Sequence, residues 1–180
     1  EIAVISLGGI VASRSLKTAG DRMNDDVIKF VRNRYNLLLG EKTAEDIKIS
    51  IGSAYPMEKE LEMVVRGRDL LSGLPKEVVI GDDEIREALA HSVRVIAGNI
   101  KAVIEETPPE LVGDIMQRGI ILAGGGGTIN GLDRLVAEQT GMSVRKMEDP
   151  LTAVVRGTGI VLENLKKFKE MLTDLESGKK

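Results

Sequence analysis

The sequence contains no cysteine, one histidine and only four aromatic residues, two Phe and two Tyr, among 180 residues. Without cysteine the chain forms no disulfide, no thiolate zinc site and no cysteine nucleophile. A single histidine, His91, cannot build a histidine-rich metal site, and we expect it to be a surface residue. The few aromatic rings exclude the stacking platform of a single-stranded nucleic-acid binder.

Strong positive charge and long apolar runs are also missing. The formal net charge is −3 and the pI is about 5.4, so the chain lacks the basic surface that binds a phosphate backbone. No run of eighteen apolar residues is present, and we expect no membrane span. The opening residues, 1–7, resemble a strand rather than a signal peptide. We therefore expect the chain to begin at a cut inside a fold. The lack of cysteine suits a reducing cytoplasm, and we expect the protein to be cytoplasmic.

Hydrophobic residues make up 42% of the chain, enough for an aliphatic core in one domain with a small lobe. The first half predicts a hairpin around Gly8–Gly9, a helix capped by Asp21 or Asn24, and a second short helix. The predicted elements are strands 2–7 and 10–15, helices 21–38 (ended by Gly40) and 43–51, and strands 63–67 and 77–80, with a turn at 73–75.

The second half alternates helices and strands. A long helix capped by Asp82 is followed by a short one with Pro109 in its first turn. The later elements are a buried strand 119–123, a helix 131–140, a strand 144–146 and a final helix from Asp149 to about Leu172. This order predicts an α/β layer with a smaller lobe inserted near residues 21–80.

The strongest local signal is the glycine run at 124–127, which lies between a buried strand and a helix. Glycine lets a ligand approach the main chain closely, which favours a nucleotide site; a tight strand-to-helix connection without a ligand is the alternative. The run is neither a P-loop nor a G-x-G-x-x-G motif. Glu148, about twenty residues further on, leaves a Rossmann-type dinucleotide enzyme open.

Two weaker signals precede this loop. Glu45 and Lys48 share a helix face, where they suit ribose hydroxyls and a purine edge, although a surface ion pair is the commoner use of such a pair. Ala19–Gly20–Asp21 suits a phosphate, or simply a turn with a helix cap. The final amphipathic helix either contacts a membrane or packs on its own domain.

Taken together, these motifs resemble the actin-like ATPases. Residues 119–132 are similar to the adenosine motif of that family, and residues 149–159 to its second connecting helix. Three further segments are similar to the MreB group of bacterial actin homologues, which determine rod shape. These segments are 43–45, 73–75 and 107–111, and the resemblance covers essentially the whole chain.

The resemblance implies the C-terminal half of an actin-like molecule. Residues 1–20 and 81–180 would form the large ribonuclease-H-like subdomain, and residues 21–80 a smaller inserted α+β subdomain. Glu45, Asp46, Ile47 and Lys48 would contact the adenosine of ATP. The α-phosphate side would be formed by Gly124, Gly125, Gly126, Gly127 and Thr128, and the γ-phosphate end by Gly20 and Asp21.

The resemblance also implies parts that this chain does not hold. These are the first phosphate loop, the first strand of the sheet, and an N-terminal domain that orients Mg²⁺ and the attacking water and contacts the membrane. We expect no catalytic residue and no metal ligand in this chain, and negligible ATP hydrolysis by it alone, because phosphoryl transfer needs groups on both sides of the nucleotide.

The intact protein is expected to form filaments at the inner face of the membrane, to hydrolyse ATP with Mg²⁺ slowly, and to scaffold cell-wall synthesis. Its partners would be the wall-elongation machinery and a membrane-anchored adaptor, with no nucleic acid. The alternatives are another ATPase of the superfamily (a chaperone ATPase or a sugar kinase), the Rossmann enzyme, and a pure interaction module.

Overall fold

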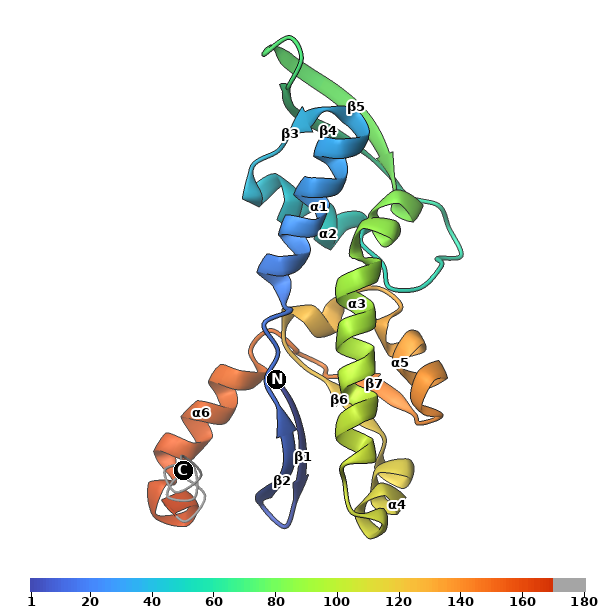
Figure 1. The fold of residues 1–180 in the computed structure, drawn as a ribbon. Coiled ribbons are helices and arrows are strands. Elements are labelled where there is room, and N and C mark those ends of the chain that lie inside the picture. The colour runs from blue at the N-terminus through green and yellow to red at the C-terminus, as the bar shows by residue number, and fades with distance from the viewer. Residues whose placement is uncertain (170–180) are drawn as a thin grey trace.

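The computed structural model describes residues 1–169, which form an elongated molecule with one long helix running through most of its length (Figure 1). The elements of the first part are β1 (Ile2–Ser6), β2 (Gly9–Arg14), α1 (Gly20–Tyr35), β3 (Leu37–Leu38), α2 (Glu41–Ile51), β4 (Glu62–Asp69) and β5 (Pro75–Gly81). Those of the second part are α3 (Asp82–Glu105), α4 (Pro109–Arg118), β6 (Ile120–Leu122), the short 3-10 helix η1 (Gly125–Thr128), α5 (Leu132–Thr140), β7 (Val144–Lys146) and α6 (Ala153–Glu163).

The amino-terminal hairpin is confirmed. β1 and β2 pair antiparallel, and Leu7 and Gly8 both have positive φ in the turn between them. Two successive positive-φ residues give the turn a twist that matches that of the flanking strands. Arg14 at the end of β2 donates to the Asn99 side chain at 3.0 Å and pairs with Glu106, so the hairpin is tied to α3.

The helix expected over residues 21–38 is shorter. It ends at Tyr35 because Asn36 adopts the left-handed conformation, with φ 52°, and its N–H donates to the Arg32 carbonyl. Leu37 and Leu38 then form β3, where the periodicity had predicted helix. Gly40 is the N-cap of α2 rather than the end of α1. The predicted caps are wrong as well: Ala19 precedes α1, and Gly81 rather than Asp82 precedes α3.

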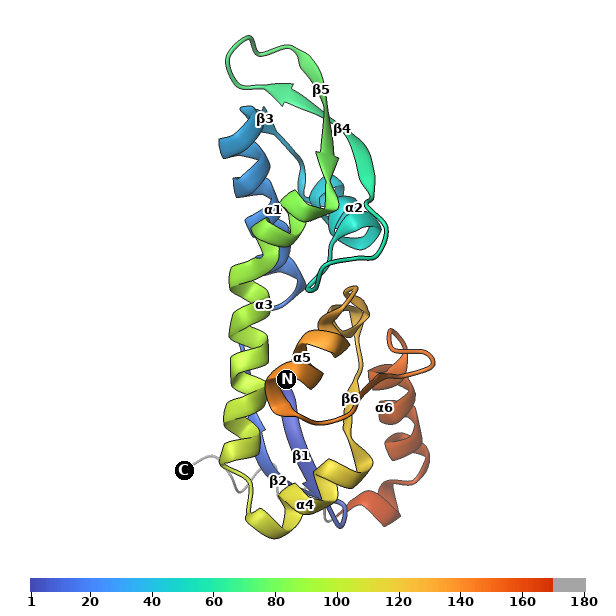
Figure 2. The same ribbon diagram turned by 90° about the vertical axis from the view of Figure 1, so that its right-hand side faces the viewer.

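A three-stranded antiparallel sheet in the order β3-β4-β5 lies at one end of the molecule. Its β4–β5 hairpin reaches beyond the helices (Figures 1 and 2) and turns at Gly73, which has φ 75°. The strands and turn expected here are confirmed. Val64 and Val79 are cross-strand partners on its outer face, and each is more than half exposed.

The α-β-α-β-α order of the last third is confirmed by the sequence of α4, β6, α5, β7 and α6. β6 and β7 pair in parallel from Ile120–Val144 to Leu122–Lys146. The β1–β2 hairpin runs beside β6 in Figures 1 and 2, yet the two strand pairs form separate sheets.

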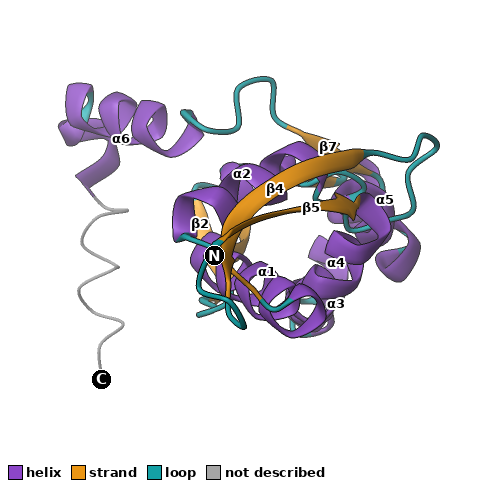
Figure 3. Ribbon diagram, turned by 90° about the horizontal axis from the view of Figure 1, so that it is seen from above, coloured by secondary structure: helices purple, strands orange, loops and turns teal. Residues whose placement is uncertain are grey.

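Helix α6 stands apart from the other elements, as Figures 1 and 3 show. Val154 and Val155 are 73% and 67% exposed. A Cβ at Gly157 or Gly159 would meet nothing within 4 Å, so among residues 1–169 the alternative in which this helix packs on its own domain is not observed. The helix ends at Glu163, and the predicted end near Leu172 lies outside the described residues.

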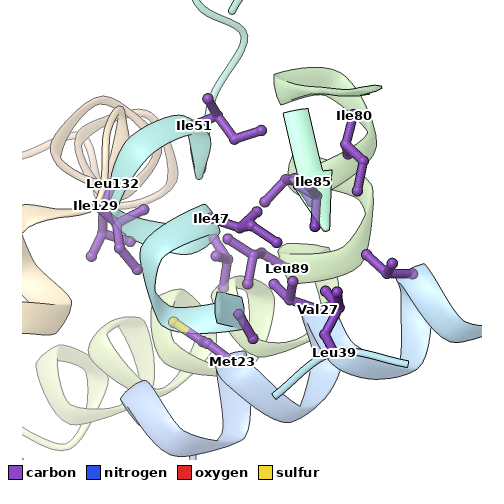
Figure 4. Packing of buried hydrophobic residues seen from close by; sticks show 14 of the residues in the cluster. Met23, Val27, Leu39, Ile47, Ile51, Ile80, Ile85, Leu89, Ile129 and Leu132 are labelled. Atoms are coloured by element: carbon purple, nitrogen blue, oxygen red, sulfur yellow. The ribbon is translucent and has the colours of Figure 1, made fainter. Parts of the chain in front are cut away.

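The core gathers where α1, α2 and α3 meet (Figure 4). Ile47 of α2 points toward Ile85 and Leu89 of α3, and all three are completely buried. Ile129 and Leu132, which flank the start of α5, extend the same cluster. His91 is exposed on α3, as expected. Among residues 1–169 no helix is long and apolar enough to cross a membrane.

Candidate functional site

The glycine run follows β6 and changes direction at once. Gly124 has φ 75°, and its N–H donates to the Pro150 carbonyl at 2.7 Å. Gly125–Thr128 then form the 3-10 helix, within which the Thr128 hydroxyl donates to the Gly125 carbonyl at 2.6 Å. The loop is therefore shaped by backbone contacts and by one hydroxyl that turns back on it.

Packing explains some of these glycines and not others. A Cβ at Gly127 would lie 3.1 Å from the Leu122 Cβ, and one at Gly131 would lie 2.5 Å from the Tyr55 Cβ. By contrast, a Cβ at Gly126 would meet nothing within 4 Å, and one at Gly125 only the Leu151 Cδ2 at an ordinary 3.6 Å. Packing thus excludes a side chain at Gly131 and leaves little room for one at Gly127, whereas the space beside Gly125 and Gly126 is open.

Lys48 connects α2 to the start of α1. Its Nζ donates to the Asn24 Oδ1 at 2.8 Å and to the Gly20 carbonyl at 3.3 Å. Asn24 is only 4% exposed. Among the described residues no ion pair joins Lys48 to Glu45, so the surface pair that the sequence left open is not formed. Two predicted site segments, 20–21 and 45–48, are brought together here.

The other predicted residues of these segments divide into two groups. Asp21, Glu45 and Asp46 are exposed, with Asp21 in the first turn of α1. The Ile47 side chain is instead completely buried in the core. Ile47 faces inward to pack α2 while its neighbours face out, so its predicted contact with a ligand stays a prediction for its backbone atoms only.

The segment after α2 docks on the glycine loop. The Ala54 N–H donates to the Asn130 carbonyl at 2.7 Å, and Ser53 forms an isolated parallel bridge with Asn130. Ser53 is fully buried, and its hydroxyl has no hydrogen-bond partner. These contacts bring the end of α2 to the loop, although 78 residues separate Gly52 from Asn130.

Sequence reasoning missed Asn24 and Lys146. Lys146, the last residue of β7, donates to the Ile129 carbonyl at 3.1 Å and to the Thr128 carbonyl at 3.5 Å. No local pattern marks it, since its partners lie in a separate segment. The nearest signal for Asn24 is its position one helical turn after Gly20.

An open cavity of about 430 Å³ lies between residues 55–61 and the start of α5. Tyr55, Asn130 and Lys146 line it, and none of the predicted site residues does. Arg134 and Glu58, which also line it, pair at 3.6 Å. Among residues 1–169 no three His, Cys, Asp or Glu side chains come together where they could hold a metal ion.

Comparison with known proteins adds the family. A family model described as "MreB/Mbl protein" matches residues 1–170. The chain is 46% identical over 168 residues to the cell shape-determining protein Mbl of Bacillus subtilis, covering 93% of this chain and 50% of that protein. To the cell shape-determining protein MreB of Escherichia coli it is 47% identical over 163 residues, covering 91% and 47%.

A similar architecture occurs in a solved structure. The crystal structure of MreB5 of Spiroplasma citri bound to ADP superimposes with a TM-score of 0.87 and 42% identity, covering 93% of this chain and 51% of that one. The same protein has also been solved bound to AMPPNP, with the same TM-score. The chain spans about half the length of the relatives that it matches.

Proposed function

Because the chain belongs to the MreB/Mbl family, we propose that it is the C-terminal half of a filament-forming, actin-like protein that determines cell shape. The protein would bind ATP, assemble with further copies of itself at the inner face of the membrane, and scaffold cell-wall synthesis. Its partners would be the wall-elongation machinery and a membrane-anchored adaptor. The names of the curated relatives and the nucleotides in the similar crystal structures support this proposal.

The observation that carries the nucleotide assignment is the open space beside Gly125 and Gly126. Backbone that is free of side chains can approach a sugar or a phosphate closely. We propose that residues 124–128 follow the adenosine and α-phosphate side of ATP. Two glycines that packing does not require favour this role over a tight connection without a ligand.

Glu45 and Lys48 would bind the adenosine from the opposite side, with Asp46 beside them. Lys48 is already positioned through Asn24, so it needs little rearrangement on binding. Gly20 and Asp21 would face the γ-phosphate end. For Mg²⁺ we propose no ligand set within this chain.

The same assignment divides the chain into two subdomains. Residues 1–20 and 81–180 would form the large ribonuclease-H-like subdomain, and residues 21–80 the smaller outer one. A strand from the other half of the protein would lie between β1 and β6, which run side by side without pairing. The exposed Ile5 and Ile121 on these strands support this arrangement.

Ligand binding tests the proposal. The substitution Gly126→Ala should leave the melting temperature of the chain unchanged, because its Cβ enters open space, while lowering affinity for ATP about tenfold, or 1.4 kcal/mol. The measurement is titration calorimetry of the 180-residue chain and of the full-length protein. Gly98→Ala, at an exposed position within α3 and also in open space, is the control for affinity and should keep the wild-type value.

Further experiments test the choice of nucleotide, the lack of ATP hydrolysis by the chain alone, and the formation of filaments. Equal affinity for NADH and ATP would contradict the ATP assignment, and titration with GTP measures base preference.

The 180-residue chain should bind ATP weakly and release negligible phosphate, since it would hold one side of the cleft; robust turnover by it would refute this. Full-length protein should sediment as polymer with ATP, and a failure to do so would refute the filament role.

A further inference from the structure

The glycine loop depends on contacts from outside it. Residues 124–127 carry no side chain that could pack into the core, and glycine has the greatest conformational freedom of any residue. Apart from the bond from the Thr128 hydroxyl to the Gly125 carbonyl at 2.6 Å, the hydrogen bonds within the loop are long: the Gly127 N–H lies 3.2 Å from the Gly124 carbonyl, and the Ile129 N–H lies 3.4 Å from that of Gly126. Such bonds restrain the backbone weakly.

Lys146 supplies a charged donor at the far end of the loop. Its ammonium donates to the carbonyls of Ile129 at 3.1 Å and of Thr128 at 3.5 Å. It also pairs with Asp133, in the first turn of α5, at 3.6 Å, and its side chain is 31% exposed. The Lys146 ammonium therefore links the end of β7 to the end of the loop and to the start of α5.

The Thr128 and Ile129 carbonyls accept from Lys146, so these two oxygens are engaged on the side of the loop where Lys146 lies. Both carbonyl oxygens turn toward Lys146, which lines the cavity beside residues 55–61. Its charge offsets the negative ends of two peptide dipoles that would otherwise point into an open, aqueous space. The near end of the loop is held separately, by the bond from the Gly124 N–H to Pro150. Gly125, Gly126 and Gly127 lie between these two anchors, and the first two of them border open space.

We propose that Lys146 is a positioning residue that holds the glycine loop in its nucleotide-binding shape without touching the nucleotide. The proposal rests on the proposed function for its effect on affinity, but not for its effect on the loop. An ordinary exposed ion pair with Asp133 would contribute little, whereas two backbone carbonyls make the same ammonium a restraint on the main chain.

Hydrogen exchange of the nucleotide-free 180-residue chain tests the restraint directly. In Lys146→Met the amides of Gly127, Ile129 and Leu132 should exchange about tenfold faster, while those of α3 keep wild-type rates. Lys146→Arg should restore slow exchange because it keeps the cation. Arg145→Met removes an equal charge from the exposed neighbouring position on β7 and should change nothing.

Affinity for ATP, titrated on the same variants in the full-length protein, tests the consequence. Lys146→Met should weaken binding about tenfold, with rescue by Lys146→Arg and no effect of Arg145→Met. Lys146→Gln, which keeps a donor without the charge, serves if the Met variant is unfolded, and should be intermediate in both measurements.

The outcomes separate the two proposals. Wild-type exchange rates in Lys146→Met and Lys146→Gln would overturn the inference, whether or not ATP binds. Faster exchange in a protein whose wild type binds no nucleotide would support the restraint and refute the proposed function. Faster exchange with undiminished ATP affinity would overturn the positioning role.

Discussion

Four successive glycines, Gly124–Gly127, have three kinds of surroundings. Gly124 adopts a positive φ that side chains rarely tolerate, Gly127 lies against Leu122, and Gly125 and Gly126 border open space. The four glycines cannot be distinguished in the sequence. They differ in the φ angle and in the atoms packed against them, and both depend on the folded structure. The glycine loop could therefore be located from the sequence, but which of its glycines border open space could not.

Tyr35 illustrates a contact between distant segments that controls stability. Its hydroxyl lies 2.7 Å from both carboxylate oxygens of Glu84, and so joins the end of α1 to the start of α3. Burial, and next the hydrogen bond to Glu84 and its negative charge, raise the pKa of Tyr35 to about 12 from its ordinary 10.0.

The pH dependence follows from this sign. A raised pKa in the folded state means that the contribution is complete below pH 10 and is lost as the pH rises toward 12. We expect the free energy of unfolding to fall across this interval in the wild type and to fall less in Tyr35→Phe. At pH 7 the variant should lose about 1–2 kcal/mol. Urea unfolding at pH 7, 9 and 11 measures both, and equal slopes would contradict the assignment.

At the scale of elements, the junction between α1 and α2 shows where sequence patterns fail. Apolar spacing continues through Leu37 and Leu38, yet the helix ends because Asn36 turns left-handed. The two leucines then pair with Arg68 and Asp69 of β4. Helical periodicity could not reveal this, since the pairing partner lies about thirty residues away. The hairpins were predictable because their turns and strands are adjacent in the chain.

The close approach of β3 and β4 gives a prediction for Gly67. A Cβ there would lie 2.5 Å from the Leu38 carbonyl oxygen and 2.9 Å from the Leu37 Cγ. Gly67→Ala should therefore cost about 1–3 kcal/mol of stability. The matched change Gly98→Ala lies inside α3 with nothing within 4 Å, and should add about 0.5–1 kcal/mol. Thermal unfolding of both variants checks the contrast; equal losses would refute it.

For the whole molecule, the order of elements and the family could be derived from the sequence, whereas the arrangement of the sheets could not. The strands expected in one layer form two separate pairs, β1–β2 and β6–β7. Strand pairing depends on which neighbours are present, and no local pattern records that. The exposed valines of α6 were likewise invisible, since an amphipathic stripe normally predicts burial.

The exposed Val154 and Val155 give a prediction that differs between the 180-residue chain and the proposed full-length protein. Val154→Ser with Val155→Ser should change the stability of the 180-residue chain by less than about 0.5 kcal/mol per site, because both side chains are exposed. If the other half of the protein covers this face, the same pair should destabilise the full-length protein, measured by its melting temperature. Loss of stability in the chain alone would contradict the exposure.

Helix α3 packs on α1, α2 and β5 at one end and on α5 and the β1–β2 hairpin toward the other. Its 24 residues span about 36 Å, so a tilt of about 10° would carry one end about 6 Å. Helix α5, which begins just after the glycine loop, packs directly against α3. Because α3 is one continuous helix, a tilt caused by a displacement of α5 would also move β5, which packs at its other end.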